Sequence, residues 1–166
     1  MRISIKLDYN QIMILKVYTD GGSKGNPGLS SIGIVMYLDK KKIFVHKESI
    51  GLATNNEAEY QALIKALENV KKRFLDFSRN DKISSPVILS ESDVTSDESR
   101  DLKIEFYSDS RLMVNQVNGI FKVKSGKIKE YILKIRCLEQ EINLPVSYCL
   151  IPREQNQEAD RLVNSL

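Results

Sequence analysis

The sequence has little of what marks several large classes of protein. No apolar run approaches the roughly 20 residues that a membrane helix needs. The N-terminus also lacks the charged, apolar and small-residue zones of a secretory signal, so a cytoplasmic protein is expected. The only two cysteines, Cys137 and Cys149, have no CxxC spacing and are expected to be reduced thiols packed as small hydrophobic side chains.

The chain has 166 residues, the size of a single domain, and a formal net charge of only +3. The charge is unevenly distributed along it. Residues 76–101 hold seven acids against three bases, whereas residues 122–136 hold six bases and one acid. A basic cluster of this kind fits a solvated helix face as well as a contact with nucleic acid.

Hydrophobic periodicity predicts five strands and four helices. The strands are expected at 14–20, 30–38, 41–50, 101–109 and 146–151. The helices are expected at 54–74, 110–118, 125–142 and 156–166. This order predicts an α/β protein with a mixed sheet and helices on its faces. Residues 78–100, with seven serines and no sustained period, are expected to form a polar insertion.

The helix expected at 54–74 combines a start signal with an unusual acid. Thr54 and Glu57 have the spacing of a capping box. The apolar stripe of this helix consists of Ala62, Leu63, Ala66, Leu67 and Val70. Counting back from the stripe by three and four residues reaches Glu59, so a carboxylate is expected on the side of the helix that faces the core.

Three further acids lie at the ends of predicted elements. Asp20 and Asp109 each end a strand, and their carboxylates meet if those two strands are parallel neighbours. Taken singly, each could equally be an ordinary turn or helix-capping residue. Asp160 lies one turn into the last helix, which Asn156 is expected to cap, although an acid also suits the dipole of a helix start.

Four carboxylates in one place require cations. Two anionic groups about 4 Å apart repel by roughly 4 kcal/mol at an effective dielectric constant near 20. Oxygen ligands of this kind are those that Mg²⁺ prefers, and a pair of such ions suits in-line displacement at phosphorus.

The glycine-rich stretch from Gly21 to Gly28 has two other readings, a dinucleotide fingerprint or a P-loop. Both must open a helix, whereas this stretch runs into a strand pattern. It is therefore predicted to be a turn beside the metal site.

Together these segments resemble ribonuclease H type 1. "YTDGGSKGNPG", "ATNNEAEYQALIKAL", "IEFYSDSRLMVNQVNG" and "IPREQNQEADRL" are similar, in the right order, to the four acid-bearing blocks of that family. The resemblance covers about Leu15 to Leu166, outside the insertion. It implies the ribonuclease H-like fold, with a five-stranded mixed sheet of three antiparallel and then two parallel strands. It also implies a monomeric endonuclease that hydrolyses the RNA strand of RNA/DNA hybrids and leaves 5′-phosphate ends.

The resemblance assigns roles motif by motif. The metal-binding catalytic acids correspond to Asp20, Glu59, Asp109 and Asp160. They would hold two Mg²⁺ ions, which Mn²⁺ can replace, one activating the attacking water and the other stabilising the leaving 3′ oxygen.

Substrate contacts follow from the same motifs. Asn26, Asn55 and Asn56 match residues that read minor-groove edges and ribose 2′-hydroxyls, although a turn and helix capping are their ordinary roles. Thr54 matches a contact to a phosphate of the DNA strand. The other expected substrate-binding residues are Lys122, Lys124 and Arg153.

The sequence departs from the better-known bacterial pattern. The only histidine, His46, lies in the third strand, so the mobile histidine usually found before the fourth acid is missing, and Arg153 and Glu154 stand in that region. There is no tryptophan, and the remnant of a basic substrate handle would be Lys122, Lys124, Lys127 and Lys129. Residues 1–12 precede the usual start of the family, which makes Met13 a candidate initiator.

Other functions fit parts of this pattern. A non-catalytic hybrid-binding protein on the same fold is the main alternative, but a binder gains nothing from four mutually repelling acids. A sugar-kinase or actin-like ATPase needs two related domains, for which 166 residues are too few. A detached nuclease domain of a retroelement would share every catalytic residue.

Overall fold

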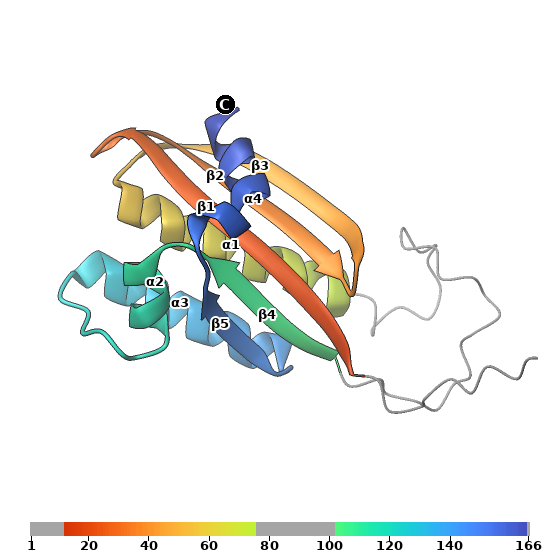
Figure 1. Ribbon diagram of the computed structural model, residues 1–166. Helices are drawn as coiled ribbons and strands as arrows, with labels where there is room; N and C mark the ends of the chain where they lie inside the picture. The colour runs from red at the N-terminus through yellow and green to blue at the C-terminus, as the bar shows by residue number, and fades with distance from the viewer. Residues whose placement is uncertain (1–11, 76–101, 166) are drawn as a thin grey trace, which may run out of the picture.

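The structure, a computed structural model, describes residues 12–75 and 102–165. The predicted insertion at 78–100 and residues 1–11 of the predicted extension lie outside the described residues. The strands are β1 (Met13–Gly25), β2 (Gly28–Leu38), β3 (Lys41–Ala53), β4 (Leu102–Ser108) and β5 (Val146–Leu150). They form one sheet in the order β3-β2-β1-β4-β5 (Figure 1), in which β1, β2 and β3 are antiparallel and β4 and β5 run parallel to β1. The predicted five-stranded mixed sheet is confirmed.

Helices cover both faces of this sheet. They are α1 (Asn55–Leu75), α2 (Arg111–Val117), α3 (Gly126–Ile142) and α4 (Gln157–Asn164). The first three share one hydrophobic core with one face of the sheet, whereas α4 lies on the other face (Figure 1). A short 3₁₀ helix, η1 (Arg153–Gln155), precedes α4 and was not predicted from the sequence.

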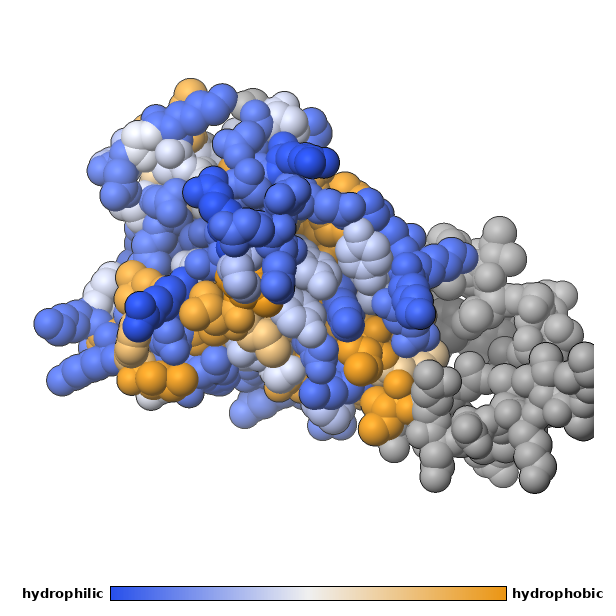
Figure 2. Space-filling view, in the orientation of Figure 1, coloured by the Kyte–Doolittle hydropathy of each residue, from blue (hydrophilic) through white to orange (hydrophobic). Residues whose placement is uncertain are grey.

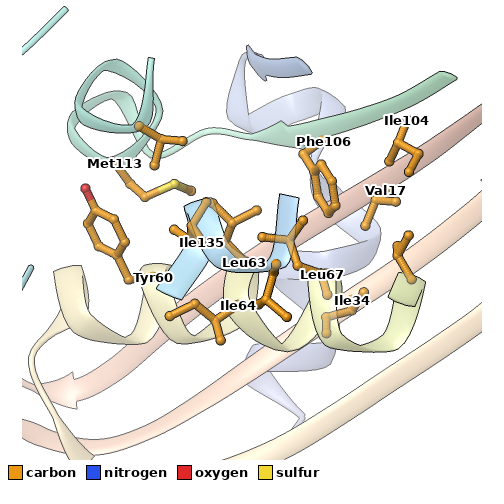
Figure 3. Packing of buried hydrophobic residues seen from close by; sticks show 14 of the residues in the cluster. Val17, Ile34, Tyr60, Leu63, Ile64, Leu67, Ile104, Phe106, Met113 and Ile135 are labelled. Carbon is orange, nitrogen blue, oxygen red and sulfur yellow. The ribbon is translucent and has the colours of Figure 1, made fainter. Parts of the chain in front are cut away.

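The main core lies between the sheet and α1 and α3. All five residues of the predicted apolar stripe of α1 are buried. Leu63 and Leu67 of this stripe pack with Val17 and Phe106 of the strands and with Ile135 of α3 (Figure 3). The stripe is therefore confirmed, and its burial fixes which side of α1 faces the sheet.

Strand β1 is longer than predicted. Instead of ending at Asp20, it remains paired with β2 through Gly25, and only Asn26 and Pro27 connect the two strands. The four glycines predicted as a turn are thus all strand residues. Ser23 explains part of the difference, because its hydroxyl donates a hydrogen bond of 2.9 Å to the carbonyl of Ala53 at the end of β3.

Two further features concern the cysteines and the helices. Both cysteines are free, but Cys137 is exposed on α3, so the prediction that it packs as a buried hydrophobic residue is wrong. The apolar positions of α3 face the core, and Cys137 falls outside them. Within residues 12–75 and 102–165, no helix combines the length and apolar content that crossing a bilayer requires.

Candidate active site

Asp20 lies in β1, and Asp109 directly follows β4, the parallel neighbour of β1 in the sheet. The register of β1 and β4 pairs Tyr18 with Tyr107, whose rings stack with centroids 5.0 Å apart. Asp20 lies two residues beyond Tyr18 in β1, and Asp109 lies two residues beyond Tyr107, just past the end of β4. The sequence predicts that the two carboxylates meet if these strands are parallel neighbours, and the structure pairs β1 and β4 in this way.

Glycines let two helices approach Asp20 from opposite faces of the sheet. A Cβ at Gly21 would overlap the main chain of Ala58 in α1. Gly33, the partner of Asp20 on β2, has no room for a Cβ because the carbonyl oxygen of Ala159 in α4 lies there. Glu59 and Asp160 directly follow Ala58 and Ala159. The two close approaches thus bring both acids toward Asp20.

Burial and neighbouring acids raise the pKa of two of these carboxyl groups. Asp20 is 7% exposed, and burial, followed by the charges of Asp109 and Asp160, raises its pKa to about 6. Glu59 is 6% exposed, and its pKa lies well above the usual range because of burial and then the charges of Asp20 and Asp109. This part of the molecule therefore favours either protons or added cations.

Asp160 and Asp109 are each engaged by a neighbouring polar side chain. Arg153 Nη2 donates a hydrogen bond of 2.6 Å to Asp160 Oδ1. Arg153 also lowers the pKa of Asp20 and of Glu59, so its guanidinium acts as a partial counter-ion for the cluster. Asn156 Nδ2 donates to Asp109 Oδ1 at 2.7 Å and to the carbonyl oxygen of Thr19 at 3.0 Å.

Asn156 is the predicted N-cap residue of α4, but its side chain has another role. It occupies the N-cap position, but its side chain makes no capping hydrogen bond. Its amide nitrogen instead joins β1, the end of β4 and the start of α4. Sequence reasoning missed this contact, because its two acceptors are distant in the chain and only the folded sheet brings them together.

The chemistry of the four acids fits a divalent metal ion. All of their donor atoms are carboxylate oxygens, the type that Mg²⁺ prefers. Glu59 Oε2 is buried without a hydrogen-bond partner among the described residues, so one ligand atom is left for a cation. As they are placed within residues 12–75 and 102–165, no three or more His, Cys, Asp or Glu side chains lie close enough together to hold a metal ion. Two of the four acids instead accept the hydrogen bonds from Arg153 and Asn156.

The predicted minor-groove residues lie at one edge of the site. Asn26 Oδ1 accepts a hydrogen bond of 3.1 Å from the main-chain nitrogen of Asn55. Asn55 Oδ1 in turn accepts one of 3.3 Å from Ser23 N. Asn56 Oδ1 is buried and has no partner among the described residues. The tip of the β1–β2 hairpin is therefore tied to the start of α1.

The capping box at the start of α1 is confirmed. Thr54 N donates to Glu57 Oε2 at 2.8 Å, and Glu57 N donates to Thr54 Oγ1 at 3.2 Å. Glu57 also pairs with Lys127 of α3, whose Nζ lies 2.7 Å from Glu57 Oε1. This ion pair places the beginning of the basic helix α3 next to the beginning of α1.

The remaining predicted residues are arranged as follows. Lys122 and Lys124 are exposed in the connection between α2 and α3, and Lys129 is exposed on α3. His46 lies in β3, two strands away from β1, where its ring contacts Glu48 at 3.0 Å. The only histidine of the chain is therefore separate from the four acids.

Known proteins are similar to this chain in sequence and in fold. The RNase H family matches residues 13–82, and a family described as reverse transcriptase-like matches residues 100–166. Ribonuclease HI of Halobacterium salinarum is 31% identical over 148 residues, which are 89% of this chain and 61% of that protein. A bifunctional protein of Mycobacterium tuberculosis is 30% identical over 154 residues, 92% of this chain. The chain spans only 35% of that protein, about a third of the length of the first curated relatives.

Solved structures agree with these sequence relations. LC11-RNase H1, isolated from compost by a metagenomic approach, is 35% identical with a TM-score of 0.73, over 91% of this chain and 93% of that chain. The same protein solved in complex with an RNA/DNA hybrid is 34% identical, with a TM-score of 0.70, over 91% of this chain and 94% of that one. RNase H1 of Halobacterium salinarum is 30% identical with a TM-score of 0.71, over 92% and 96% of the two chains. The fold is that of the ribonuclease H-like proteins. Within that class, the chain belongs to the type 1 ribonuclease H family.

Proposed function

We propose that this protein is a metal-dependent endonuclease that hydrolyses the RNA strand of RNA/DNA hybrids and leaves 5′-phosphate ends. The observation that carries the proposal is the close approach of α1 and α4 to the two faces of the sheet around the buried Asp20, which brings Glu59 and Asp160 toward it. Family membership and the hybrid complex of the related LC11-RNase H1 support it. A protein that only bound hybrids would have no use for such a cluster.

The four acids would hold the metal ions. Asp20 and Glu59 supply buried carboxylates, and Asp109 and Asp160 supply carboxylates on adjoining elements. Two bound Mg²⁺ ions would supply Lewis acidity for activating a water molecule and for stabilising charge on the leaving oxygen. The protein's own task is to hold its carboxylates ionised, and the positive charge of Arg153 assists this.

Arg153 is suited to contact the phosphate. Its side chain is 72% exposed and already reaches Asp160. A guanidinium stays protonated at every accessible pH, so Arg153 orients a phosphate and does not carry a proton. The asparagines at the hairpin tip and the start of α1 would read the minor groove, where a 2′-hydroxyl distinguishes RNA from DNA.

Cleavage of an end-labelled RNA/DNA hybrid tests this proposal. The protein should cut the RNA strand in the presence of Mg²⁺ or Mn²⁺, should stop when EDTA is added, and should leave duplex DNA intact. Asp109→Asn should abolish cleavage while circular dichroism shows an intact fold, because an amide cannot replace a carboxylate ligand. Glu141→Gln, at the C-terminal end of α3, is the matched control. Tight hybrid binding without cleavage by either metal would instead identify a non-catalytic binder.

A further inference from the structure

Helix α4 carries Asp160 but has little of its own to fix its position. It is eight residues long, its N-cap residue makes no side-chain capping hydrogen bond, and only Ala159 and Val163 are buried. An isolated helix of this length is marginal in water. The surface around α4 is largely hydrophilic (Figure 2), so polar contacts with the sheet contribute much of its attachment.

Glu158 attaches the first turn of α4 to two strands. Its Oε2 accepts a hydrogen bond of 2.6 Å from the hydroxyl of Tyr37 in β2, and its Oε1 accepts one of 3.0 Å from Nζ of Lys42 in β3. Hydrogen bonds to an ionised group are roughly twice as strong as those between neutral groups. The last turn is held separately, because the hydroxyl of Ser31 donates to the carbonyl of Val163 at 2.8 Å.

Tyr37 also connects this contact to the strands beside which the other acids lie. Its ring meets that of Tyr18 at 84°, with centroids 5.9 Å apart, and the ring of Tyr18 stacks on that of Tyr107 with centroids 5.0 Å apart. Edge-to-face and stacked pairs are the arrangements that aromatic rings prefer. A continuous row of side chains therefore runs from β4 across β1 and β2 to α4, formed by Tyr107, Tyr18, Tyr37 and Glu158.

This row lies close in the chain to three of the four acids. Three of its members each precede an acid by two residues, namely Tyr18 before Asp20, Tyr107 before Asp109 and Glu158 before Asp160. Two residues of a strand span about 7 Å, and two residues of a helix about 3 Å. A displacement of the row therefore moves the acids with it.

We propose that Tyr37 and Glu158 are positioning residues for Asp160. Their hydrogen bond fixes the first turn of α4 against the sheet, and with it the distance of Asp160 from the acids of β1 and of the end of β4. The ion pair of Glu158 with Lys42 contributes less, because both side chains are nearly half exposed and solvent screens the pair. The inference rests on the proposed function, since it takes Asp160 to be a metal ligand.

Binding of Mn²⁺ to the protein without hybrid, measured from the EPR signal of the free ion, tests this role. Tyr37→Phe keeps the ring and its contact with Tyr18 but removes the hydroxyl. We expect it to weaken Mn²⁺ binding about tenfold, the lower end of the cost of losing an outer-shell partner. In hybrid cleavage, the Mg²⁺ concentration that gives half the maximal rate should rise by a similar factor, while KM for the hybrid stays unchanged.

Tyr148→Phe is the matched control. It also removes a hydrogen bond of 2.6 Å from a tyrosine hydroxyl to a carboxylate, in this case that of Glu139 in α3. We expect this variant to lose stability without any change in Mn²⁺ binding. Equal Mn²⁺ affinities for the two variants would overturn the proposal, because the contact of Tyr37 would then be no more than structural.

Two variants of Glu158 separate position from charge. Glu158→Ala removes both acceptors and one negative charge, whereas Glu158→Gln removes the same charge but keeps an oxygen for the hydroxyl of Tyr37. We expect the alanine variant to bind Mn²⁺ about tenfold more weakly than the glutamine variant. Equal affinities would show that only the charge of Glu158 matters and would overturn its positioning role.

The two measurements also separate this inference from the proposed function. A wild-type protein that binds Mn²⁺ but does not cleave a hybrid would refute the nuclease, and the affinities of the variants would still decide the role of Tyr37 and Glu158. An active wild type whose Mn²⁺ affinity the Tyr37→Phe variant retains would refute the positioning role alone. A wild type that binds no Mn²⁺ would overturn both.

Discussion

A carboxyl group as buried as that of Asp20 prefers a proton unless a cation compensates its charge. Burial and the neighbouring acids raise its pKa from 3.8 to about 6. The folded protein therefore binds the proton more tightly than the unfolded chain does. Its contribution to stability is present below pH 4 and is lost as the pH rises toward 6 and beyond.

In EDTA, we expect the Asp20→Asn variant to be more stable than the wild type at pH 7.5 and equally stable near pH 4. The rise in pKa corresponds to roughly 3 kcal/mol at most. Urea unfolding between pH 4 and 8 measures this, with Glu68→Gln as a control on the exposed side of α1. A variant that is less stable than the wild type at pH 7.5 would show that Asp20 has a structural role.

Asn156 gives a second prediction at the scale of single residues. Asn156→Ala leaves the buried carbonyl of Thr19 unpaired, which costs about 1–3 kcal/mol, and it frees the carboxylate of Asp109. We expect kcat on a hybrid to fall while KM changes little, because Asp109 is then no longer positioned. Asn69→Ala, which removes a hydrogen bond of 2.8 Å within α1, is the control. Equal changes in kcat for the two variants would make Asn156 a purely structural residue.

At the scale of elements, periodicity and spacing predicted most of the helices and strands. A helical period alone was enough to predict the apolar stripe of α1. Counting back along that stripe then predicted that Glu59 faces the core. The extent of β1 could not be predicted, because a run of glycines resembles a turn unless the contacts of α1 and α4 are known. The contacts of Asn156 could not be predicted from the sequence either, because Thr19 lies 137 residues away in the chain.

The close packing of α4 on β2 gives a prediction about Gly33. Gly33→Ala places a Cβ where Ala159 O and Leu162 Cβ already lie, so α4 must shift and Asp160 with it. We expect a loss of about 1–3 kcal/mol of stability and a larger proportional loss of cleavage. Gly126→Ala, where a Cβ has open space, should leave both unchanged. Thermal unfolding and hybrid cleavage by the two variants provide the comparison.

For the whole molecule, the basic residues should determine how salt weakens hybrid binding. Each lysine that contacts a phosphate contributes about 0.9 to the slope of log affinity against log salt concentration on a duplex. Lys122 and Lys124 are exposed in the connection between α2 and α3, whereas Lys127 is paired with Glu57. We expect Lys122→Ala with Lys124→Ala to lower the slope, and Lys40→Ala with Lys41→Ala to leave it unchanged. Identical slopes for both pairs would place the binding surface elsewhere.

The parallel pairing of β1 with β4 has a consequence for the proposed active site. Asp20 and Glu59 come from the segment before residue 76, and Asp109 and Asp160 come from the segment after residue 101. Each half of the polypeptide therefore contributes two of the four acids. Neither half alone contains the complete set. The two halves are held together by three sets of contacts. These are the pairing of β1 with β4, the packing of α1 against α3 and the packing of α4 on β2. The proposed activity therefore depends on the contacts between the two segments as much as on the acids themselves.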